Sequence, residues 1–208
     1  TRKEELQLDQ IVIFKNYTKT IKGTSSAETL TGTSGNDRIE GGPILFDRFG
    51  DGNDKLIGGA GNDLLIGGTN KHATGGYYVD TYVFGNGSGK DQIIGFLTDG
   101  TGSSTEYYDR IELLSNINGT GITTSSSVLS RISENADTDA VIDLGSGNSI
   151  TLKGVRKAEL KDKHFDVIKE TNEIVSGTNN NDVISQVSTS SKLQGSKNPY
   201  QRFGDGND

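Results

Sequence analysis

The sequence predicts an all-β protein: a parallel β-roll, a small antiparallel β element after it, and then the start of a second copy of the roll. Three observations lead to this prediction. Glycine- and aspartate-rich nonapeptides follow one another through residues 23–94. After residue 105 the hydrophobic period changes to the alternation of half-buried strands. Finally, residues 1–54 match residues 155–208 without a gap.

The nonapeptide unit is clearest in residues 49–57 and 58–66. Both have the form G-G-x-G-x-D-x-U-x, where U is a large aliphatic residue, and only Phe49 departs from it. Glycines in the first six positions allow a tight turn with positive φ. The last three positions predict a short strand whose U side chain points inward. Large apolar residues share this phase: Ile39, Leu56, Leu65, Tyr82 and Ile93.

Weaker units extend the frame in both directions. They are residues 23–31, 32–40, 75–83 and 86–94. Glu28 takes the acidic position in the first of them. The segments 41–48 and 67–74 are one residue short and lack the aspartate, and we count each as a degenerate unit of the roll.

These repeats resemble the RTX (repeats-in-toxin) nonapeptides of secreted, calcium-binding bacterial proteins. The run Tyr82-Val83-Phe84 before a further Gly-x-Gly-x-x-Asp is similar to the closing repeats of RTX blocks. The resemblance implies that successive units alternate between two sides of a flattened roll, with Ca²⁺ between repeat n and repeat n+2. It also implies type I secretion and an extracellular location.

The expected Ca²⁺ ligands are the carboxylates at position six and carbonyl oxygens of the turns, because calcium prefers six to eight hard oxygen ligands. Counting facing repeats as n and n+2 pairs Asp37 with Asp54. The same count pairs Asp63 with Asp80 and leaves Asp91 without an acidic partner. The full set of expected metal-binding residues is Asp37, Gly50, Asp51, Gly52, Asp54, Gly59, Gly61, Asp63, Asp80, Asp91, Asp182, Asp205 and Asp208.

Other metals fit the pattern less well. Magnesium prefers a strict octahedral shell and keeps its waters, whereas a cage of carbonyl oxygens suits calcium. Zinc is disfavoured because the chain has no cysteine and only two histidines, His72 and His164, in different segments.

The long internal repeat has a constant step of 154 positions, as from Arg2 to Arg156 and from Gly23 to Gly177. Residues 48–54 are identical to residues 202–208. In the second copy Ser191 replaces Asp37, and Asp182 stands in the place of Glu28. Constant length with diverged sequence indicates a tandem array in which geometry matters.

The repeat suggests four segments along the chain. We expect residues 1–22 to end a preceding module, with a strand at 11–14. Residues 23–94 form the roll, residues 95–175 an antiparallel element that caps it and links it onward, and residues 176–208 the start of the next roll. Within the antiparallel element, strands are expected at residues 109–113, 128–132, 140–144 and 149–152, with a hairpin loop at 145–148.

Composition and the absence of known motifs argue against several classes of function. The formal net charge of −7 argues against a nucleic-acid-binding protein, which needs a basic face. No apolar run is long enough for a membrane span, and no metalloprotease, P-loop or nucleophile-elbow motif occurs. A hydrophobic fraction of 30% is low for a globular domain, so bound cations are an expected source of stability.

The sequence therefore favours a non-enzymatic, calcium-binding structural module of a large extracellular tandem-repeat protein. Such a protein would form a surface layer, an adhesin stalk or a self-assembling fibre at the bacterial cell surface, and its modules would fold on calcium after export. Its expected partners are neighbouring copies, with cell-surface polysaccharide as a further candidate. The alternative is an accessory, polysaccharide-interacting module of a secreted enzyme, because residues 109–113, 147–155 and 160–168 are similar to regions beside RTX repeats, including modules of mannuronan epimerases.

Overall fold

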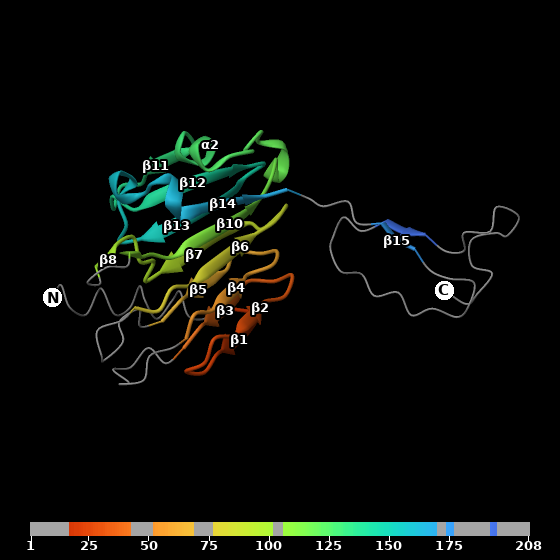
Figure 1. Ribbon diagram of the computed structural model, residues 1–208, viewed down its shortest axis with the longest axis horizontal. Coiled ribbons are helices and arrows are strands. Elements are labelled where there is room, and N and C mark those ends of the chain that lie inside the picture. Colours follow the sequence, from red (N-terminus) through yellow and green to blue (C-terminus); the bar gives the residue numbers. More distant parts are fainter. Residues whose placement is uncertain are drawn as a thin grey trace, which may run out of the picture. The chain divides into compact units, whose positions relative to one another are not determined.

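The structure is a computed structural model that describes residues 17–42, 52–68, 77–101 and 106–169, together with two short strands at 174–176 and 192–194. The chain divides into two compact units, Thr1–Ile168 and Lys169–Asp208. Nearly all regular elements of the first unit are β-strands (Figure 1). The described residues include no helix that is both long and apolar enough to cross a membrane.

Two facing sheets build the first unit, and the chain alternates between them. A seven-stranded sheet has the order β1-β3-β5-β7-β13-β12-β11, and a five-stranded sheet has the order β14-β10-β6-β4-β2. In the roll, the first sheet takes β1 (Lys19–Lys22), β3 (Asp37–Glu40), β5 (Leu64–Ile66) and β7 (Lys90–Ile94). The second sheet takes β2 (Thr29–Thr31), β4 (Lys55–Ile57) and β6 (Thr81–Phe84).

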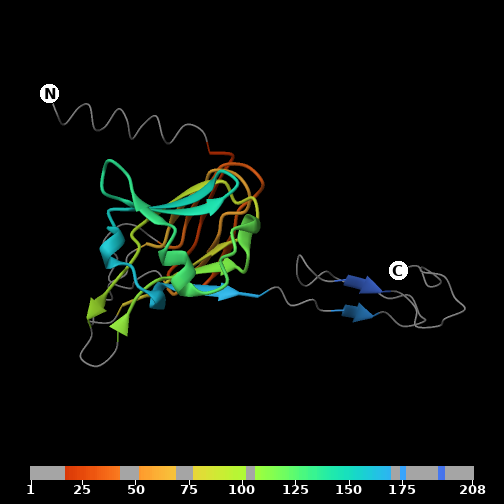
Figure 2. The ribbon, with the colours of Figure 1, turned by 90° about the horizontal axis from the view of Figure 1, so that it is seen from above.

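All pairings between roll strands are parallel, as the resemblance implied. The predicted all-β fold with a parallel β-roll is therefore confirmed. Figure 2 looks along the stack and shows the turns beneath one another. The short antiparallel pair β8 (Gly100–Thr101) and β9 (Glu106–Tyr107) lies at the rim, outside both main sheets (Figure 2).

The length of one turn of the roll differs from the expectation. Leu65 pairs with Ile39, 26 positions earlier, and the hydrogen-bonded aspartates Asp37 and Asp63 are also 26 positions apart. Because β3 pairs directly with β5 and β4 with β6, no strand comes between them. Counting the short segments 41–48 and 67–74 as units when pairing n with n+2 was wrong, because one turn of the roll spans 26 positions and not two nonapeptides.

The end of the roll is covered by the segment that follows it. This segment contributes β10 (Arg110–Leu114), β11 (Ile132–Glu134), β12 (Ala140–Gly145), β13 (Asn148–Lys153) and β14 (Phe165–Ile168). The antiparallel pairing that we expected holds for β11 with β12 and β12 with β13. In contrast, β13 pairs in parallel with β7, and β10 pairs in parallel with β6 and β14, so this segment extends both sheets of the roll.

The connections of this segment contain short helices. They are η1 (Ile117–Gly119), α2 (Ser125–Leu129), η2 (Lys157–Glu159) and η3 (Asp162–His164). The strand expected at 128–132 is wrong, because α2 continues to Leu129 and β11 begins only at Ile132. A reciprocal capping box between Thr124 and Ser127 starts the helix. The hairpin at 145–148 is confirmed: Ser146 and Gly147 both have positive φ, as a two-residue hairpin of this kind requires.

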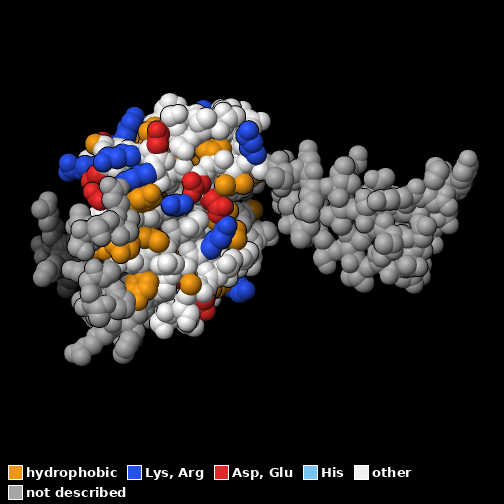
Figure 3. Space-filling model, viewed as in Figure 1, with side chains coloured by type: hydrophobic (Ala, Val, Ile, Leu, Met, Phe, Trp, Pro, Cys, Tyr) orange, Lys and Arg blue, Asp and Glu red, His pale blue; other side chains and the backbone are white. Residues whose placement is uncertain are grey.

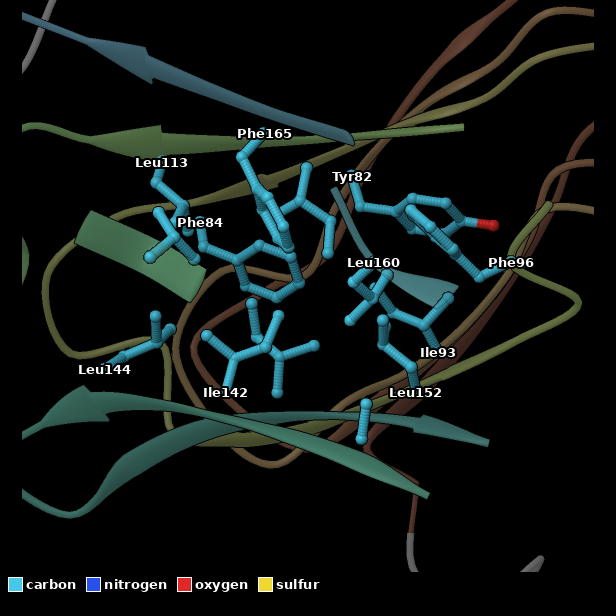
Figure 4. Packing of buried hydrophobic residues seen from close by; sticks show 14 of the residues in the cluster. Tyr82, Phe84, Ile93, Phe96, Leu113, Ile142, Leu144, Leu152, Leu160 and Phe165 are labelled. Carbon is cyan, nitrogen blue, oxygen red and sulfur yellow. The ribbon is translucent and has the colours of Figure 1, made fainter. Parts of the chain in front are cut away.

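One hydrophobic core runs between the two sheets and into the covering segment. The residues predicted to point inward, Ile39, Leu56, Leu65, Tyr82 and Ile93, are all fully buried. Figure 4 shows how Phe84, Phe165 and Ile142 from the covering segment and the roll pack together. Each such side chain contributes about 1.5–3 kcal/mol when it leaves water.

The second unit repeats the beginning of the first. β15 (Ile174–Ser176) pairs in parallel with β16 (Lys192–Gln194), and Ile174 stands opposite Lys192. In the first copy Thr20 stands opposite Arg38 in the same register, 154 positions earlier. The strand expected at 11–14 lies outside the described residues, but its counterpart 154 positions later is β14.

Candidate calcium sites

The aspartates at position six form a hydrogen-bonded column along one edge of the roll. Asp63 Oδ1 accepts the backbone N–H of Asp37 at 2.7 Å. Asp91 Oδ1 accepts the N–H of Asp63 at 2.8 Å. Asp37 begins β3, Asp63 directly precedes β5, and Asp91 is the second residue of β7, all in the seven-stranded sheet. We call Asp37, Asp63 and Asp91 the first carboxylate column.

A second carboxylate column precedes the strands of the five-stranded sheet. It consists of Glu28, Asp54, Asp80 and Asp109. In each step a carboxylate Oδ1 accepts the N–H of the acidic residue one turn earlier, at 2.8 Å. The two columns therefore use the same contact on opposite edges of the roll.

The two columns show that the aspartates lie next to different partners from those that the repeat count predicted. Asp37 lies beside Asp63 in the first column, whereas Asp54 lies beside Asp80 in the second. The pairs Asp37–Asp54 and Asp63–Asp80 are wrong, because β3 and β4 belong to different sheets, as do β5 and β6. Asp91, which we expected to lack an acidic neighbour, has Asp63 one turn earlier.

The asparagines at position five form a complementary ladder in the opposite direction. Asn36 Oδ1 accepts the N–H of Asn62 at 2.8 Å, and Asn62 Oδ1 accepts the N–H of Lys90 at 2.8 Å. On the other edge Asn53 Oδ1 accepts the N–H of Val79 at 3.0 Å. The dipeptides Asn53-Asp54 and Asn62-Asp63 thus each accept hydrogen bonds from the turn before and from the turn after. This role explains the Asn-Asp pairs of the repeats, which sequence reasoning treated only through their aspartates.

The carboxylates are buried, and part of their hydrogen-bonding capacity is unused. Asp37, Asp54 and Asp63 are each exposed by 2% or less. Asp37 Oδ1, Asp54 Oδ2 and Asp63 Oδ2 have no hydrogen-bond partner. A buried carboxylate oxygen without a partner is strongly unfavourable, and a coordinated cation relieves this. The oxygen-only donor set fits calcium.

Burial also shifts the acidity of these groups. Desolvation raises the pKa of Asp54 and of Asp63 to about 6. Burial raises the pKa of Asp91 to about 8, although the hydrogen bond from the Asp63 amide opposes the shift. At neutral pH the calcium-free roll therefore holds Asp91 mostly protonated and buries Asp54 and Asp63 as unfavourable charges, so a bound cation stabilises the charged form of all three.

Glycines bring backbone carbonyls up to the carboxylates. A Cβ on Gly41 would lie 2.5 Å from Asp54 Oδ2, and a Cβ on Gly58 would clash with Asp63 Oδ2. Gly61, at φ 113°, passes so close to Gly35 of the previous turn that a Cβ would lie 2.6 Å from its carbonyl carbon. Only glycine fits here, so the turns place carbonyl and carboxylate oxygens in the same small space.

The residues that sequence reasoning nominated fall into three groups. Asp37, Gly59, Gly61, Asp63 and Asp91 lie on the first edge, and Gly52, Asp54 and Asp80 on the second. Gly50, Asp51, Asp182, Asp205 and Asp208 lie outside the described residues. Across the described ranges, no three His, Cys, Asp or Glu side chains gather into one metal-binding cluster; the acids recur singly along the two edges.

Sequence reasoning missed Asp109 as a member of the second column. Its Oδ1 accepts the N–H of Asp80, and its Oδ2 accepts the N–H of Leu97, both at 2.8 Å. Asp109 therefore ends the column with hydrogen bonds to both oxygens. The signal was present, since Asp109-Arg110-Ile111 has the D-x-U spacing of the repeat, but residues 96–108 separate it from the roll.

One family model matches the chain, and one solved structure is similar to it. Residues 22–43 and 50–70 match the family described as RTX calcium-binding nonapeptide repeat (4 copies). Among solved structures, the chain is similar to the crystal structure of extracellular lipase LipA from Serratia marcescens, with 21% sequence identity and a TM-score of 0.44. The match covers 72% of this chain and 21% of the lipase chain, so the chain spans about a fifth of that protein. No curated protein matches the sequence.

The matched residues include β2, β3, β4 and β5 and the turns that carry Asp37, Asp54 and Asp63. The chain carries RTX calcium-binding nonapeptide repeats, folded as a parallel β-roll, and the ion that these repeats bind is Ca²⁺.

Proposed function

We propose that this chain is a calcium-binding structural module of a large extracellular tandem-repeat protein, and that Ca²⁺ binding after export drives its folding. The observation that carries the proposal is the pair of buried carboxylate columns, in which Asp37, Asp54 and Asp63 keep oxygens without hydrogen-bond partners. A fold that buries such groups is incomplete without a cation.

The buried charges of the columns make the folding of the roll depend on calcium. The acids of each column repeat once per turn, so several buried negative charges line one edge of the roll. Repulsion and desolvation destabilise the roll in the absence of cations. Calcium binds the folded state only, and each tenfold excess over its Kd adds about 1.4 kcal/mol per site. Low calcium before export and high calcium after it would therefore change the folded population.

The tandem arrangement supports the structural role. The parallel register of β15 with β16 repeats that of β1 with β3 at a step of 154 positions. Successive copies of one module suit a surface layer, an adhesin stalk or a self-assembling fibre on the bacterial cell surface. In this role the module is non-catalytic, and its main partners are neighbouring copies of itself.

The mixed surface charge suits contacts with other proteins better than with nucleic acid. On the face shown in Figure 3, Lys and Arg side chains lie next to Asp and Glu side chains rather than in a single basic area. The formal net charge of −7 supports the same conclusion.

A calcium titration of the whole chain, followed by far-ultraviolet circular dichroism with magnesium as the control, tests the proposal. We expect a cooperative gain of β structure by the roll with calcium, above the β signal that the covering segment keeps without it, and no such gain with magnesium at the same concentration. A β-sheet circular dichroism spectrum that stays unchanged in excess chelator would contradict the proposal.

A further inference from the structure

A pocket of about 380 Å³ opens beside the second carboxylate column, within the size range of small-ligand sites. Its wall comes from three neighbouring strands and the residues that precede them. Lys55, Thr81 and Arg110 stand side by side in register on β4, β6 and β10. Tyr107 and Tyr108, which precede β10, complete one side. We call this the tyrosine pocket.

Both tyrosine rings are held from behind. The Tyr107 ring packs against the Tyr77 ring, with centroids 5.4 Å apart. The Tyr108 ring meets the buried His164 ring edge-on at 5.6 Å. His164 is itself fixed, because Nδ1 accepts the N–H of Lys161 and Nε2 lies 2.9 Å from the carbonyl of Thr98. The pocket therefore has a preformed aromatic wall.

Cations surround this wall. Lys163 Nζ lies 4.6 Å from the centre of the Tyr108 ring, and the Arg110 guanidinium lies 5.7 Å from it. Lys55 pairs with Glu112 at 2.6 Å, and Arg110 pairs with Asp166 at 3.4 Å. The side chains of the two cations are 42% and 51% exposed, so both reach solvent. Ion pairs in contact with solvent contribute little, so a ligand carboxylate can replace Glu112 or Asp166 at small cost.

Asp54 and Asp80 of the second column also line the pocket, and both are buried. These carboxylates would repel an anion in the calcium-free chain, so an acidic ligand is expected only in the calcium-loaded form. Asn53 and Thr81 add neutral polar groups to the lining. The pocket thus combines aromatic, neutral polar and basic walls.

We propose that the tyrosine pocket binds one sugar residue that carries a carboxylate, as in an acidic polysaccharide. The ring of such a residue stacks on Tyr107 or Tyr108, its hydroxyl groups contact Asn53 and Thr81, and its carboxylate binds Arg110 or Lys55. This activity goes beyond the structural role above, since a module that only folds on calcium has no need of a ligand pocket.

The test uses the whole chain in saturating calcium, with a galacturonate trisaccharide as the probe and its neutral methyl ester as the comparison. Free calcium is held constant by dialysis, and binding is measured by calorimetry. We expect the acidic trisaccharide to bind at least about tenfold more tightly than the ester, because a charge-assisted hydrogen bond is lost with the ester.

Two pocket variants and a matched control locate the site, with a third pocket variant in reserve. Arg110→Gln and Tyr107→Ala should each weaken binding about tenfold, with the calcium midpoint of folding unchanged. The matched control is Arg131→Gln, which removes an arginine from another exposed pair, Arg131 with Asp143 at 2.7 Å, and should leave binding unchanged. Lys55→Gln provides a second pocket variant if Tyr107→Ala fails to fold.

Absence of binding at millimolar trisaccharide would overturn the inference, as would equal affinity for the neutral ester. Equal loss in Arg131→Gln and Arg110→Gln would also overturn it. None of these results bears on calcium-driven folding, which the same samples report separately through circular dichroism.

Discussion

Buried aspartates occur in two parts of this molecule, and the two parts satisfy them differently. In the covering segment, Asp139 is 4% exposed and accepts hydrogen bonds from Lys153 Nζ at 2.6 Å, the Gly154 N–H at 2.8 Å and the Asn135 amide at 3.1 Å. In the roll, Asp63 is 2% exposed and retains an oxygen without a partner. The pKa values move in opposite directions as a result.

Burial alone would raise the pKa of Asp139, but its hydrogen bonds from Lys153, Gly154 and Asn135 lower it. Burial raises the pKa of Asp63 to about 6. Burial of a carboxylate does not by itself create a metal site. In the covering segment the Lys153 ammonium neutralises the buried carboxylate, whereas in the roll a bound calcium ion has this role.

The largest expected effect comes from the core that the two parts share. Leu56→Ala removes a fully buried side chain from β4 and should lower the free energy of unfolding by about 2–5 kcal/mol. Ile57→Ala, one position along on the outward face, should lower it by less than about 1.5 kcal/mol. Urea unfolding in saturating calcium measures both. Equal losses would contradict the assignment of inward and outward faces.

The next effect separates the two kinds of aspartate. Asp63→Asn should weaken calcium binding and lower stability in calcium by about 1.4 kcal/mol for each tenfold loss of affinity. In chelator the same variant should be as stable as the parent chain or more stable, because a buried charge has gone. Thermal melting with and without calcium measures this. Asp143→Asn, at an exposed position on β12, serves as the control and should change neither.

In the covering segment the expected pattern is the reverse. Lys153→Met leaves Asp139 buried without its cation and should lower stability by about 1–3 kcal/mol. The loss should be the same in calcium and in chelator, because the pair does not involve the metal. A loss that appears only in calcium, seen in the same melting experiments, would show that Lys153 acts through the roll.

The smallest effect is a pH dependence of calcium binding. The raised pKa values of Asp54, Asp63 and Asp91 mean that the calcium-free folded chain holds protons that the unfolded chain has lost. Its stability should therefore fall as pH rises from about 4 to about 8. Calcium displaces these protons, so the extra stability that a fixed excess of calcium gives the folded chain, measured as the difference in melting temperature between calcium and chelator, should increase over the same range. Thermal melts at several pH values test this, and a difference independent of pH would contradict it.

Sequence reasoning succeeded where one residue determines the outcome. The inward positions of Ile39, Leu56 and Leu65 follow directly from the phase of the nonapeptide. Gly59 and Gly61 have the positive φ that the turn requires. These features depend only on local geometry, which the repeat specifies in full.

Sequence reasoning failed where the number of residues in one turn of the roll had to be counted across insertions. The short segments 41–48 and 67–74 occupy almost the length of one repeat, and counting them as repeats moved Asp54 to the wrong edge. Asp109 was missed because residues 96–108 interrupt the pattern before it. At 128–132, Val128 and Ile132 stand four positions apart, which suits a helix as well as an irregular strand, and only the Thr124 cap distinguishes the two.

Hydrogen exchange followed by mass spectrometry, with and without calcium, tests the central difference between the two parts most directly. We expect calcium removal to abolish amide protection in β3, β4 and β5 first, while β12 and β13 keep measurable protection in the same sample. Equal protection of the roll with and without calcium would contradict the account, because the unpaired oxygens of Asp54 and Asp63 would then need no cation.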